Sequence, residues 1–437
     1  FMSKTTADNE GNVYIIWRDT DGGTGTALYS KRSHDHGVTW THAETRLDRG
    51  PGTAGNTYAI GCDQSGNVYA VWEDSRNGSS DIYFNSSRDH GLTWMKNDVR
   101  LDTDASGAAA SVLPRMATDN KGDVYVVWVD SRHPKTAVYF NRSLDHGAPG
   151  TWLSTDIRPD ASPGPAPSYD ERDPDITCDE NGNVYVVFWK DNANSWSEQL
   201  SRRTDLVVSN YSRNYGNAGT WHDDTQISDY PYLDENGVAI NYDANHPRIG
   251  CTNDGYVYAL WQDSGSLGTH TRIDFDYSDS FGFGPSWHTD QKINSFLIDG
   301  LFSPQITCDN NGNVYTIWHD GQGPWNSIFF NRSNDHGKIG TWKSQEDILT
   351  SITPTDGGYL TDEPHMASDQ NGNVYVIWKE NESYRSGSYW DSTYLNYSRD
   401  AGDTWMTPEI ELHTNLASSS SSSLPFAYAD DKGNGYF

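Results

Sequence analysis

The segments that lead into a series of short apolar strands hold most of the side chains that could do chemistry. These candidate residues are Arg115, Arg172, Asp173, Asp175, His246, Arg248, Glu363 and His365. Arginines bind carboxylates through paired N–H donors, and two carboxylates can act together in glycoside hydrolysis. The alternative interpretation is a solvated rim whose charges pair only with one another.

A second set of candidates consists of aromatic rings outside any repeated motif. Most of the 17 tryptophans belong to two repeated signatures, whereas Trp196, Trp325 and Trp390 lie in loops between the second and third strands of their repeats. Exposed aromatic rings suit stacking on sugars. The alternative is that these rings pack the longer loops against one another.

Arg248 also belongs to a smaller set with His246 and Tyr242. In a lyase, an arginine neutralises the substrate carboxylate and a histidine or tyrosine acts as the base. These three residues are close in sequence within an ordinary loop, so the set is a weak signal.

The elements that must position these residues are the strands of a repeat. The segment GNVY, or a close variant, begins at Gly11, Gly66, Gly122, Gly182, Gly255, Gly312 and Gly372. An Asp-rich turn such as DQSGN precedes most copies, which is the chemistry of a β-hairpin. The strand before the turn often begins with proline, and a third and a short fourth strand follow, as in DIYFNSS and NDVRLDTD. Four strands repeated seven times predict an all-β fold, a β-propeller of seven complete four-stranded antiparallel blades.

A second signature follows the third strand of each repeat. It reads SHDHGVTW at Ser33, SRDHGLTW at Ser87 and SRDAGDTW at Ser398, with insertions at Ser143 and Ser333. Its Asp and His residues look catalytic, but the Asp can accept N–H groups of its own turn and the Trp can fill the gap between strands, so a structural role is predicted. The signature resembles the Asp-box, or BNR, repeat of sialidase-like propellers. This resemblance covers nearly the whole chain and implies that the boxes lie on the face opposite the active site.

The resemblance to sialidases weakens at the level of individual residues. Those enzymes use three arginines, a tyrosine with a glutamate partner, an acid/base aspartate and an Arg-Ile-Pro motif. This chain has PRIG at Pro247 and PRMA at Pro114, but no Arg-Ile-Pro. Sialidase propellers also have six blades, so a polysaccharide lyase is a separate alternative.

The chain divides into a seven-repeat propeller, residues 1–415, and a tail, residues 416–437. The tail contains a serine run and then LPFAYADDKGNGYF, which reads as the first two strands of a further repeat. A seven-bladed ring has no vacancy for these strands. Either the ring has eight blades and the chain is truncated, or residues 424–437 pair elsewhere, including with a neighbouring molecule in self-assembly.

Charge and hydropathy exclude two classes of partner. The 31 Lys and Arg residues against 61 Asp and Glu residues leave a net charge of -30, which repels phosphate backbones, so no nucleic-acid partner is expected. Apolar runs such as VYVVFW at 184–189 are far shorter than the ~20 residues of a membrane helix, so membrane insertion is not expected. The chain begins at Phe1 without a signal peptide, which indicates a processed protein or part of a longer one, and an extracellular or cell-surface location is predicted.

Four cysteines occupy one repeat-equivalent position just before the turn: Cys62, Cys178, Cys251 and Cys308. Because packed sheets lie ~10 Å apart, equivalent positions in neighbouring blades are too distant for a disulfide, and four buried thiols are predicted. The Asp-rich turns invite a calcium interpretation, but they lack the distal bidentate Glu of a calcium loop. No metal ligand is assigned and no cofactor is expected, with calcium kept as an alternative.

Asn-x-Ser motifs predict sugar acceptors in a secreted glycoprotein. They occur at Asn77, Asn85, Asn141, Asn210, Asn331, Asn381 and Asn396. The alternative is that five of them restate the junction between the third strand and the Asp-box.

These features leave three hypotheses for the function. The first, favoured by the regular repeats and the acidic charge, is an extracellular propeller that binds glycans or a neighbouring protein without catalysis. The second is a glycan-cleaving enzyme, a sialidase-like glycoside hydrolase or a polysaccharide lyase, acting at the central mouth. The third is an architectural subunit assembled by strand exchange through the tail.

Overall fold

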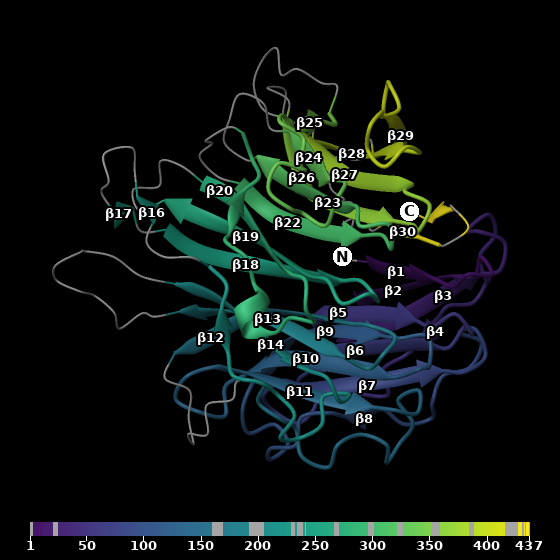
Figure 1. Cartoon of the computed structure of the whole chain (residues 1–437). Coiled ribbons are helices and arrows are strands. Elements are labelled where there is room, and N and C mark those ends of the chain that lie inside the picture. Colours follow the sequence, from purple (N-terminus) through teal and green to yellow (C-terminus); the bar gives the residue numbers. More distant parts are fainter. Residues whose placement is uncertain are drawn as a thin grey trace.

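The computed structural model describes residues 3–20, 25–159, 169–191, 205–228, 232–233, 239–240, 242–265, 271–295, 301–320, 327–350, 359–383, 389–415, 427–430, 432 and 434–436. At several strand ends, including 359–363 and 389–391, the description covers the backbone only. The chain forms a seven-bladed propeller of four-stranded antiparallel blades, as the sequence predicts (Figure 1). Its described residues contain a single 3₁₀ turn, η1 (Gly284–Ser286), and otherwise strands.

Each blade takes consecutive strands from the centre outward. Blades one to four contain β1 (Ser3–Ala7), β2 (Val13–Thr20), β3 (Thr26–Ser33), β4 (Thr45–Arg46); β5 (Ala54–Cys62), β6 (Val68–Asp74), β7 (Asp81–Ser87), β8 (Val99–Arg100); β9 (Ser111–Thr118), β10 (Val124–Asp130), β11 (Ala137–Ser143); and β12 (Asp170–Cys178), β13 (Val184–Asp191), β14 (Leu206–Ser212), β15 (Thr225–Gln226). In blade three the fourth strand is reduced to a bridge between Phe140 and Ile157.

Blades five to seven follow the same order. They contain β18 (Tyr242–Cys251), β19 (Val257–Gly265), β20 (Thr271–Ser278), β21 (Gln291–Lys292); β22 (Leu301–Cys308), β23 (Val314–Asp320), β24 (Ile328–Ser333), β25 (Asp347–Ile348); and β26 (Tyr359–Ser368), β27 (Val374–Ser383), β28 (Tyr389–Ser398), β29 (Ile410–Asn415). Two further two-stranded sheets are formed by β16 (Tyr232–Leu233) with β17 (Ala239–Ile240), and by β30 (Tyr428–Ala429) with β31 (Gly435–Tyr436).

The repeated Asp-rich turn is stabilised by its own side chains. In blade two, Asp63 Oδ1 accepts the backbone N–H of Ser65 at 2.9 Å and of Asn67 at 3.0 Å. Its Oδ2 accepts from Asn67 Nδ2 at 2.6 Å and from the Tyr69 hydroxyl at 2.8 Å. One buried carboxylate is thus saturated by four donors, which explains why Asp, Asn and Tyr recur at fixed spacing.

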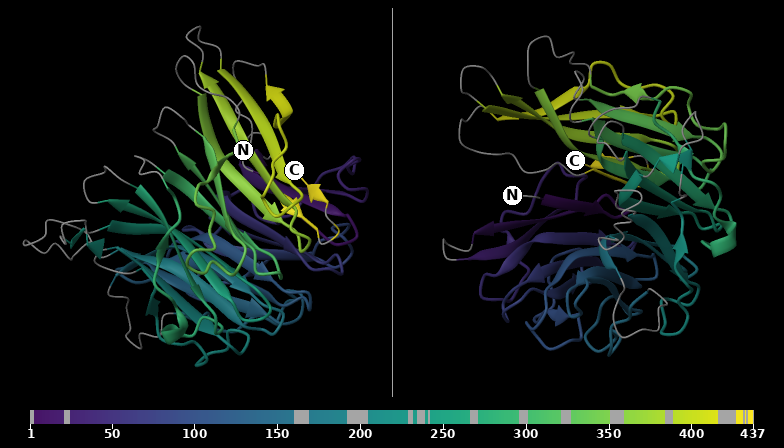
Figure 2. Two further views of the ribbon diagram at one scale, coloured as in Figure 1. Left: turned by 45° about the horizontal axis from the view of Figure 1, so that its top comes forward. Right: turned by 90° about the vertical axis from the view of Figure 1, so that its left-hand side faces the viewer.

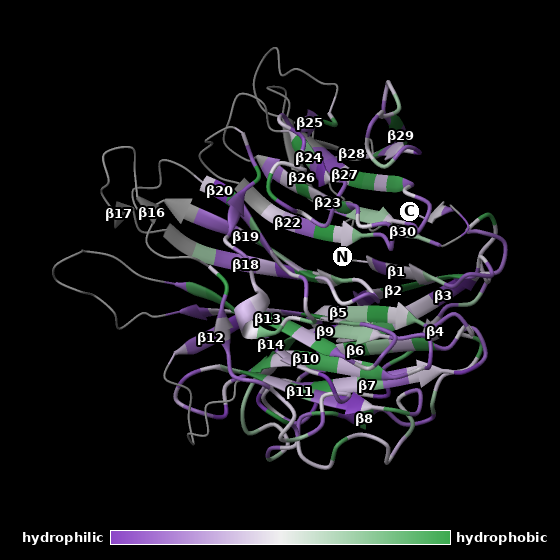
Figure 3. Cartoon of the chain, in the orientation of Figure 1, coloured by the Kyte–Doolittle hydropathy of each residue, from purple (hydrophilic) through white to green (hydrophobic). Residues whose placement is uncertain are grey.

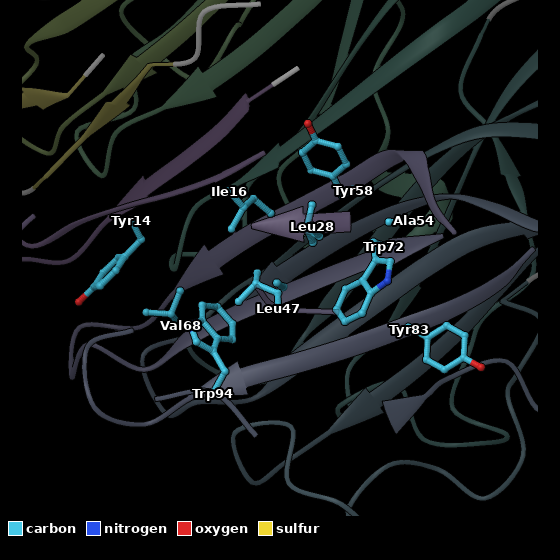
Figure 4. Packing of buried hydrophobic residues seen from close by; sticks show 11 residues of the cluster. Tyr14, Ile16, Leu28, Leu47, Ala54, Tyr58, Val68, Trp72, Tyr83 and Trp94 are labelled. Carbon is cyan, nitrogen blue, oxygen red and sulfur yellow. The ribbon is translucent and has the colours of Figure 1, made fainter. Parts of the chain in front are cut away.

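The hydrophobic core lies between blades. Tyr14, Ile16 and Leu28 of blade one pack against Val68 and Trp72 of blade two in one cluster of buried residues (Figure 4). Hydropathic colour follows this arrangement, with apolar residues on the strands and polar residues in the connections (Figure 3). Burying one such tryptophan contributes about 3–5 kcal/mol relative to alanine.

The acidic residue of the Trp-x-Asp motif accepts the indole N–H of the buried tryptophan in blades two and three. Trp72 is fully buried, and its Nε1 donates to Asp74 Oδ2 at 3.3 Å. Trp128 donates to Asp130 at the same distance. The acidic residue two positions later is therefore structural.

The Asp-box joins each blade to the one before it. Phe84 of blade two packs edge-on against box Trp152 of blade three, with ring centroids 4.8 Å apart. A Cβ on box Gly147, whose φ is 69°, would lie 2.2 Å from Phe84. Box His146 Nδ1 lies 2.9 Å from the Tyr69 hydroxyl of blade two. In blade one, box Asp35 Oδ1 accepts the Thr39 N–H of its own turn at 2.7 Å. These contacts give the box Asp, His, Gly and Trp the structural role predicted for them.

The C-terminal hairpin lies inside the ring of its own chain. β30 contacts both β26 of blade seven and β1 of blade one (Figure 2). Tyr436 donates to Asp430 Oδ2 at 2.7 Å and lies 3.0 Å from His36 Nδ1, which repeats the link between Tyr69 and His146. The prediction that a seven-bladed ring has no vacancy for the tail is therefore wrong, since blades seven and one leave room for a two-stranded wedge.

Five of the predicted sugar acceptors are buried by the fold. Asn85, Asn141, Asn210, Asn331 and Asn396 are each at most 3% exposed. Asn141 Nδ2, for example, donates to the Leu101 carbonyl at 2.9 Å. These amides hold neighbouring blades together and are inaccessible to a sugar, which corrects that prediction. Asn77 is exposed, and the side chain of Asn381 lies outside the described residues.

All four cysteines are unpaired thiols, as predicted. Burial raises the pKa of Cys62 and of Cys251 to about 12. Cys62 Sγ lies 3.0 Å from the Ala7 carbonyl of blade one, and Cys308 Sγ lies 3.3 Å from the Cys251 carbonyl. The thiols therefore act as small donors between inner strands.

Candidate functional site at the centre of the propeller

A bulge interrupts the inner strand of most blades at the same level. In blades three to seven the pairing register skips two residues, which read Leu113-Pro114, Asp173-Pro174, His246-Pro247, Ser303-Pro304 and Glu363-Pro364. Proline has no N–H to give to a ladder, so bulges are where it is tolerated. The residue before proline has a positive φ in four of them, between 44° and 56°. The inner strands surround the central channel of the propeller, and this strained backbone recurs at the same height in several of them. That end of the channel is therefore a candidate site.

The residue that follows each bulge forms one position of a ring. Arg115, Asp175, Arg248, Gln305 and His365 pair with the corresponding residues of their second strands. Lys4 and Ala59 occupy the same register in blades one and two. All seven line a hollow of about 500 Å³, together with Tyr58, Leu113 and Met116. We call these seven residues the central ring.

The two arginines that line the hollow lie close to two carboxylates, Asp175 of the lining and Asp173 at the neighbouring bulge. Asp173 Oδ1 lies 4.0 Å from Arg115 Nη2 and 3.7 Å from Arg248 Nη1. Asp175 Oδ2 accepts the backbone N–H of Ile249 at 3.1 Å. Burial raises the pKa of Asp175 despite the opposing field of both arginines, and burial followed by repulsion from Arg248 lowers the pKa of Arg115.

The balance of charge in the hollow is opposite to that of the whole chain. The central ring contains the cations Lys4, Arg115 and Arg248 and one carboxylate, Asp175, in a protein of net charge -30. Arg115, Arg248 and Asp173 keep 32%, 21% and 20% of their side-chain surface exposed. The guanidinium groups are therefore accessible to a ligand, and their local field favours an anion.

His365 is the strongest candidate for proton transfer. Burial, and then the positive charges of Lys4, Arg248 and Arg115, hold the pKa of His365 well below the usual 6.5. Its imidazole is consequently neutral at pH 7 and able to accept a proton. Burial raises the pKa of Tyr58, which lines the same hollow from blade two, to about 12, so its hydroxyl stays protonated. Figure 4 shows that hydroxyl directed away from the apolar cluster.

The structure brings together only part of the predicted set. Arg172 is half exposed, lies 3.5 Å from Asp191 and stacks over Trp189, away from the hollow. His246 is exposed at its bulge, where Nδ1 lies 2.7 Å from Asn245 Oδ1, and it does not line the hollow. The side chains of Glu363, Trp390 and Tyr242 are not described, and Trp196 and Trp325 lie outside the described residues.

Sequence reasoning missed Lys4, Tyr58 and Gln305, although the signal was present. Each inner strand has one residue at the register of Arg115, and in blades three to seven it directly follows the proline. Aligning the repeats on the turn Asp would have selected Gln305 and Lys4 by position. Tyr58 comes from a blade without the proline and offers no such signal.

The opposite end of the channel also opens into a hollow, of about 540 Å³, but its polar residues link blades. Its lining includes the second residue of the turn in every blade: Asn9, Gln64, Asn120, Glu180, Asn253, Asn310 and Gln370. Asn253 Oδ1 accepts the Glu180 N–H at 3.0 Å, and Gln370 Oε1 accepts the Asn310 N–H at 2.8 Å. These side chains complete the hydrogen bonding of neighbouring turns.

Carboxylates that could bind a metal are occupied by protein donors. Among the described side chains, Asp81, Asp102 and Asp104 lie close enough together to share an ion. Arg100 Nη2 lies 2.6 Å from Asp102 and 2.8 Å from Asp104. A guanidinium thus supplies the positive charge there, and calcium binding elsewhere stays an untested prediction.

Comparisons with known proteins support the propeller architecture. No protein-family model and no curated protein matches the chain. Among solved structures, polysaccharide lyase Uly1 is 11% identical, with a TM-score of 0.55 over 91% of this chain and 89% of that one. A PL25 ulvan lyase is 10% identical, with a TM-score of 0.55 over 90% of each chain. The Hadza microbial sialidase Hz136 is 14% identical, with a TM-score of 0.44 over 81% and 71%.

At these identities the likeness establishes the fold alone, and the Asp-box family assignment stays a prediction. The similar structures are propellers that act on glycans. Within the described residues, no helix is long and apolar enough to cross a membrane.

Proposed function

We propose that the chain binds an acidic polysaccharide at the central ring and cleaves it by β-elimination. The observation that carries the proposal is the pair Arg115 and Arg248 beside neutral His365 in one hollow. The names of the similar lyases support the reaction class. Hydrolysis is less well supported, because it needs a pair of carboxylates and the ring contains one, Asp175, which is half-buried and accepts the Ile249 N–H.

The proposed reaction needs no further co-reactant. The uronate carboxylate of the substrate binds Arg115 and Arg248, which stabilise the charge that develops when the neighbouring carbon loses its proton. His365 accepts that proton, the electron pair forms a C=C bond, and the C–O bond to the adjacent sugar breaks. Tyr58 donates a proton to the leaving oxygen and regains one from the imidazolium through solvent.

Binding without cleavage, the first hypothesis from the sequence, is the second candidate. One observation favours it: Asp173 and Asp175 already lie near both arginines, and these carboxylates compete with a substrate carboxylate. Extracellular location fits either candidate.

A panel of uronate-containing and neutral polysaccharides tests the proposal. The ultraviolet absorbance of the new conjugated C=C reports elimination, and calorimetry reports binding. We expect Arg115→Ala and Arg248→Ala each to lower kcat/KM by about 10²-fold, and His365→Gln to abolish cleavage while retaining binding. Arg172→Ala, on the same face but outside the hollow, is the matched control.

Saturable binding of acidic glycans without any product would select the binding candidate. A folded protein that neither binds nor cleaves any acidic glycan would overturn both.

A further inference from the structure

The Asp-rich turn of blade three differs from its counterparts at one residue. In six other turns an asparagine four residues after the Asp donates its amide to that carboxylate at 2.5–2.8 Å: Asn12, Asn67, Asn183, Asn313, Asn373 and Asn434. In blade three this position is Asp123. The backbone of the turn is unchanged, because Asp119 Oδ1 still accepts the Asp123 N–H at 2.9 Å. Blade three therefore places an acceptor where the other turns place a donor.

This difference leaves buried oxygen atoms without donors. Asp119 is 3% exposed and Asp123 is 6% exposed, and the two side chains lie within hydrogen-bonding distance of each other. Among the described groups, Asp119 Oδ2 and the hydroxyl of fully buried Tyr125 have no hydrogen-bond partner. In blade six, by contrast, Tyr315 donates to Asp309 Oδ2 at 2.9 Å. A buried carboxylate without a donor is costly, so the pair in blade three must gain a proton or a cation.

The cations of the protein that lie near the pair have other partners. Lys121 Nζ donates to the Glu180 carbonyl. Arg142 Nη2 donates to Asn217 Oδ1. The titratable and charged groups around the pair are Lys121 and Tyr125 of its own hairpin, Arg142 of β11, His146 of the blade-three box, and Cys178, Glu180 and Tyr215 of blade four.

The box residue of the next blade also removes a source of positive charge. In blade two, the imidazole of His146 from the following box lies 3.4 Å from the turn carboxylate of Asp63. At the turn of blade three, the corresponding box residue is Tyr215, which packs in one cluster with Tyr125. A phenol is neutral at pH 7 and cannot replace an imidazolium.

A proton satisfies the pair without any further ligand. Protonated Asp123 donates one O–H to Asp119 Oδ2 and so reproduces the bond that asparagine makes in the other turns. Calcium takes six to eight oxygen ligands and is poorly served by two carboxylates and one hydroxyl. We propose that Asp119 and Asp123, which we call the acid pair, share one proton, and that its loss at higher pH loosens the turn at the seam between blades three and four.

The direction of the pH dependence follows from the folded and open states of the turn. Burial, and then the charge of Asp119, raise the pKa of Asp123 to about 6, whereas an Asp in an open chain titrates near ~3.9. The folded turn therefore keeps its proton to higher pH than the open turn. Its stabilisation by this proton is present at low pH and is lost as the pH rises through about 6, so opening should increase by about tenfold between pH 5 and pH 8.

Hydrogen–deuterium exchange of the whole chain at pH 5 and pH 8, measured by mass spectrometry, tests the proposal. The turn at residues 119–125 is compared with the turn at residues 309–315, where Asn313 takes the place of Asp123. The following box residue there is Ala401, which adds no titratable group. After correction for intrinsic exchange rates, we expect opening of 119–125 relative to 309–315 to rise by about tenfold from pH 5 to pH 8.

The matched variants exchange the two residue types. Asp123→Asn installs the amide donor that six other turns contain, so it should abolish the pH dependence and protect residues 119–125 at pH 8. Asn313→Asp creates a second acid pair in blade six, so residues 309–315 should open about tenfold more readily at pH 8 than at pH 5.

A ratio of opening that stays constant between pH 5 and pH 8, or that changes equally in Asp123→Asn, would overturn the proposal. Protection of residues 119–125 that calcium chloride restores at pH 8 would also overturn it, by assigning the acid pair to a metal ion.

Discussion

The protonation of His365 offers the sharpest test of the central ring, because it can be measured without a substrate. Burial and three cations from different blades hold its pKa well below 6.5. The perturbation is Lys4→Met, which keeps the length of the side chain and removes its charge. Because the Lys4 charge is one cause of the low pKa, its removal should raise the His365 pKa. For scale, a unit charge ~10 Å from a titrating group contributes roughly 1.7 kcal/mol at an effective dielectric constant of ~20.

The assay is an NMR titration of the histidine ring signals, with His365→Gln identifying the signal. In the native chain, this signal should stay in its neutral position as the pH falls through 6.5 and change only at lower pH. In Lys4→Met the midpoint should move upward. A native midpoint at or above 6.5, or no movement in Lys4→Met, would refute the reasoning.

The same pKa has a consequence for stability. The unfolded chain protonates this histidine near pH 6.5, whereas the folded chain resists protonation until lower pH. The unfolded state therefore binds more protons as the pH falls below about 6.5, and folding loses up to about 1.4 kcal/mol per pH unit from this group. Lys4→Met raises only the folded-state pKa, so it should leave the onset of this loss near pH 6.5 and reduce its total size, which urea titration at pH 5 and 7 measures. In the proposed reaction, cleavage should likewise fall as the pH drops through the His365 pKa.

Three further predictions concern the scaffold. Tyr69→Phe removes the hydroxyl donor to buried Asp63 at 2.8 Å and should lower the free energy of unfolding by about 1.5–3 kcal/mol in urea, whereas a loss under about 0.5 kcal/mol would contradict the structural role of the turn. Arg132→Met leaves the carboxylates of Asp130 and Asp156 without their guanidinium partner, whose Nη2 lies 2.6 and 2.7 Å from them. This change should lower the free energy of unfolding by about 3–5 kcal/mol in urea. An unchanged unfolding midpoint would show that these charges are solvated. Cys62 and Cys251 have pKa values of about 12, so only about one thiol in 10⁴ is ionised at pH 8. Both should resist a thiol reagent in the native chain and react on unfolding. Rapid labelling of the native chain would contradict these raised pKa values.

The sequence predicted the features that depend on local chemistry. The alternation of GNVY and the Asp-rich turns specify hairpins by themselves, because Asp63, Asn67 and Tyr69 bond within one turn. The structural role of the Asp-box also followed from its residue types. Counting these units gave the seven complete blades.

Features that depend on the closed ring were harder to predict. The low pKa of His365 comes from burial and from cations on three other blades, and the inward position of Lys4 and Gln305 comes from the register of the inner strands. Arg172 lies outside the hollow because it precedes the bulge of its strand, where its side chain lies 3.5 Å from Asp191. The place of the tail also required the ring, because the room for β30 exists only between β26 and β1.

The central ring has a consequence for how such a protein can diversify. Each of its seven positions belongs to a different repeat, and in blades three to seven it directly follows a bulge that lies outside regular pairing. A substitution at one position, such as Gln305 to a charged residue, leaves the interblade cores and the other six positions unchanged. Natural variants can therefore acquire a new ligand through a substitution in one repeat. The other repeats then need to preserve only the fold.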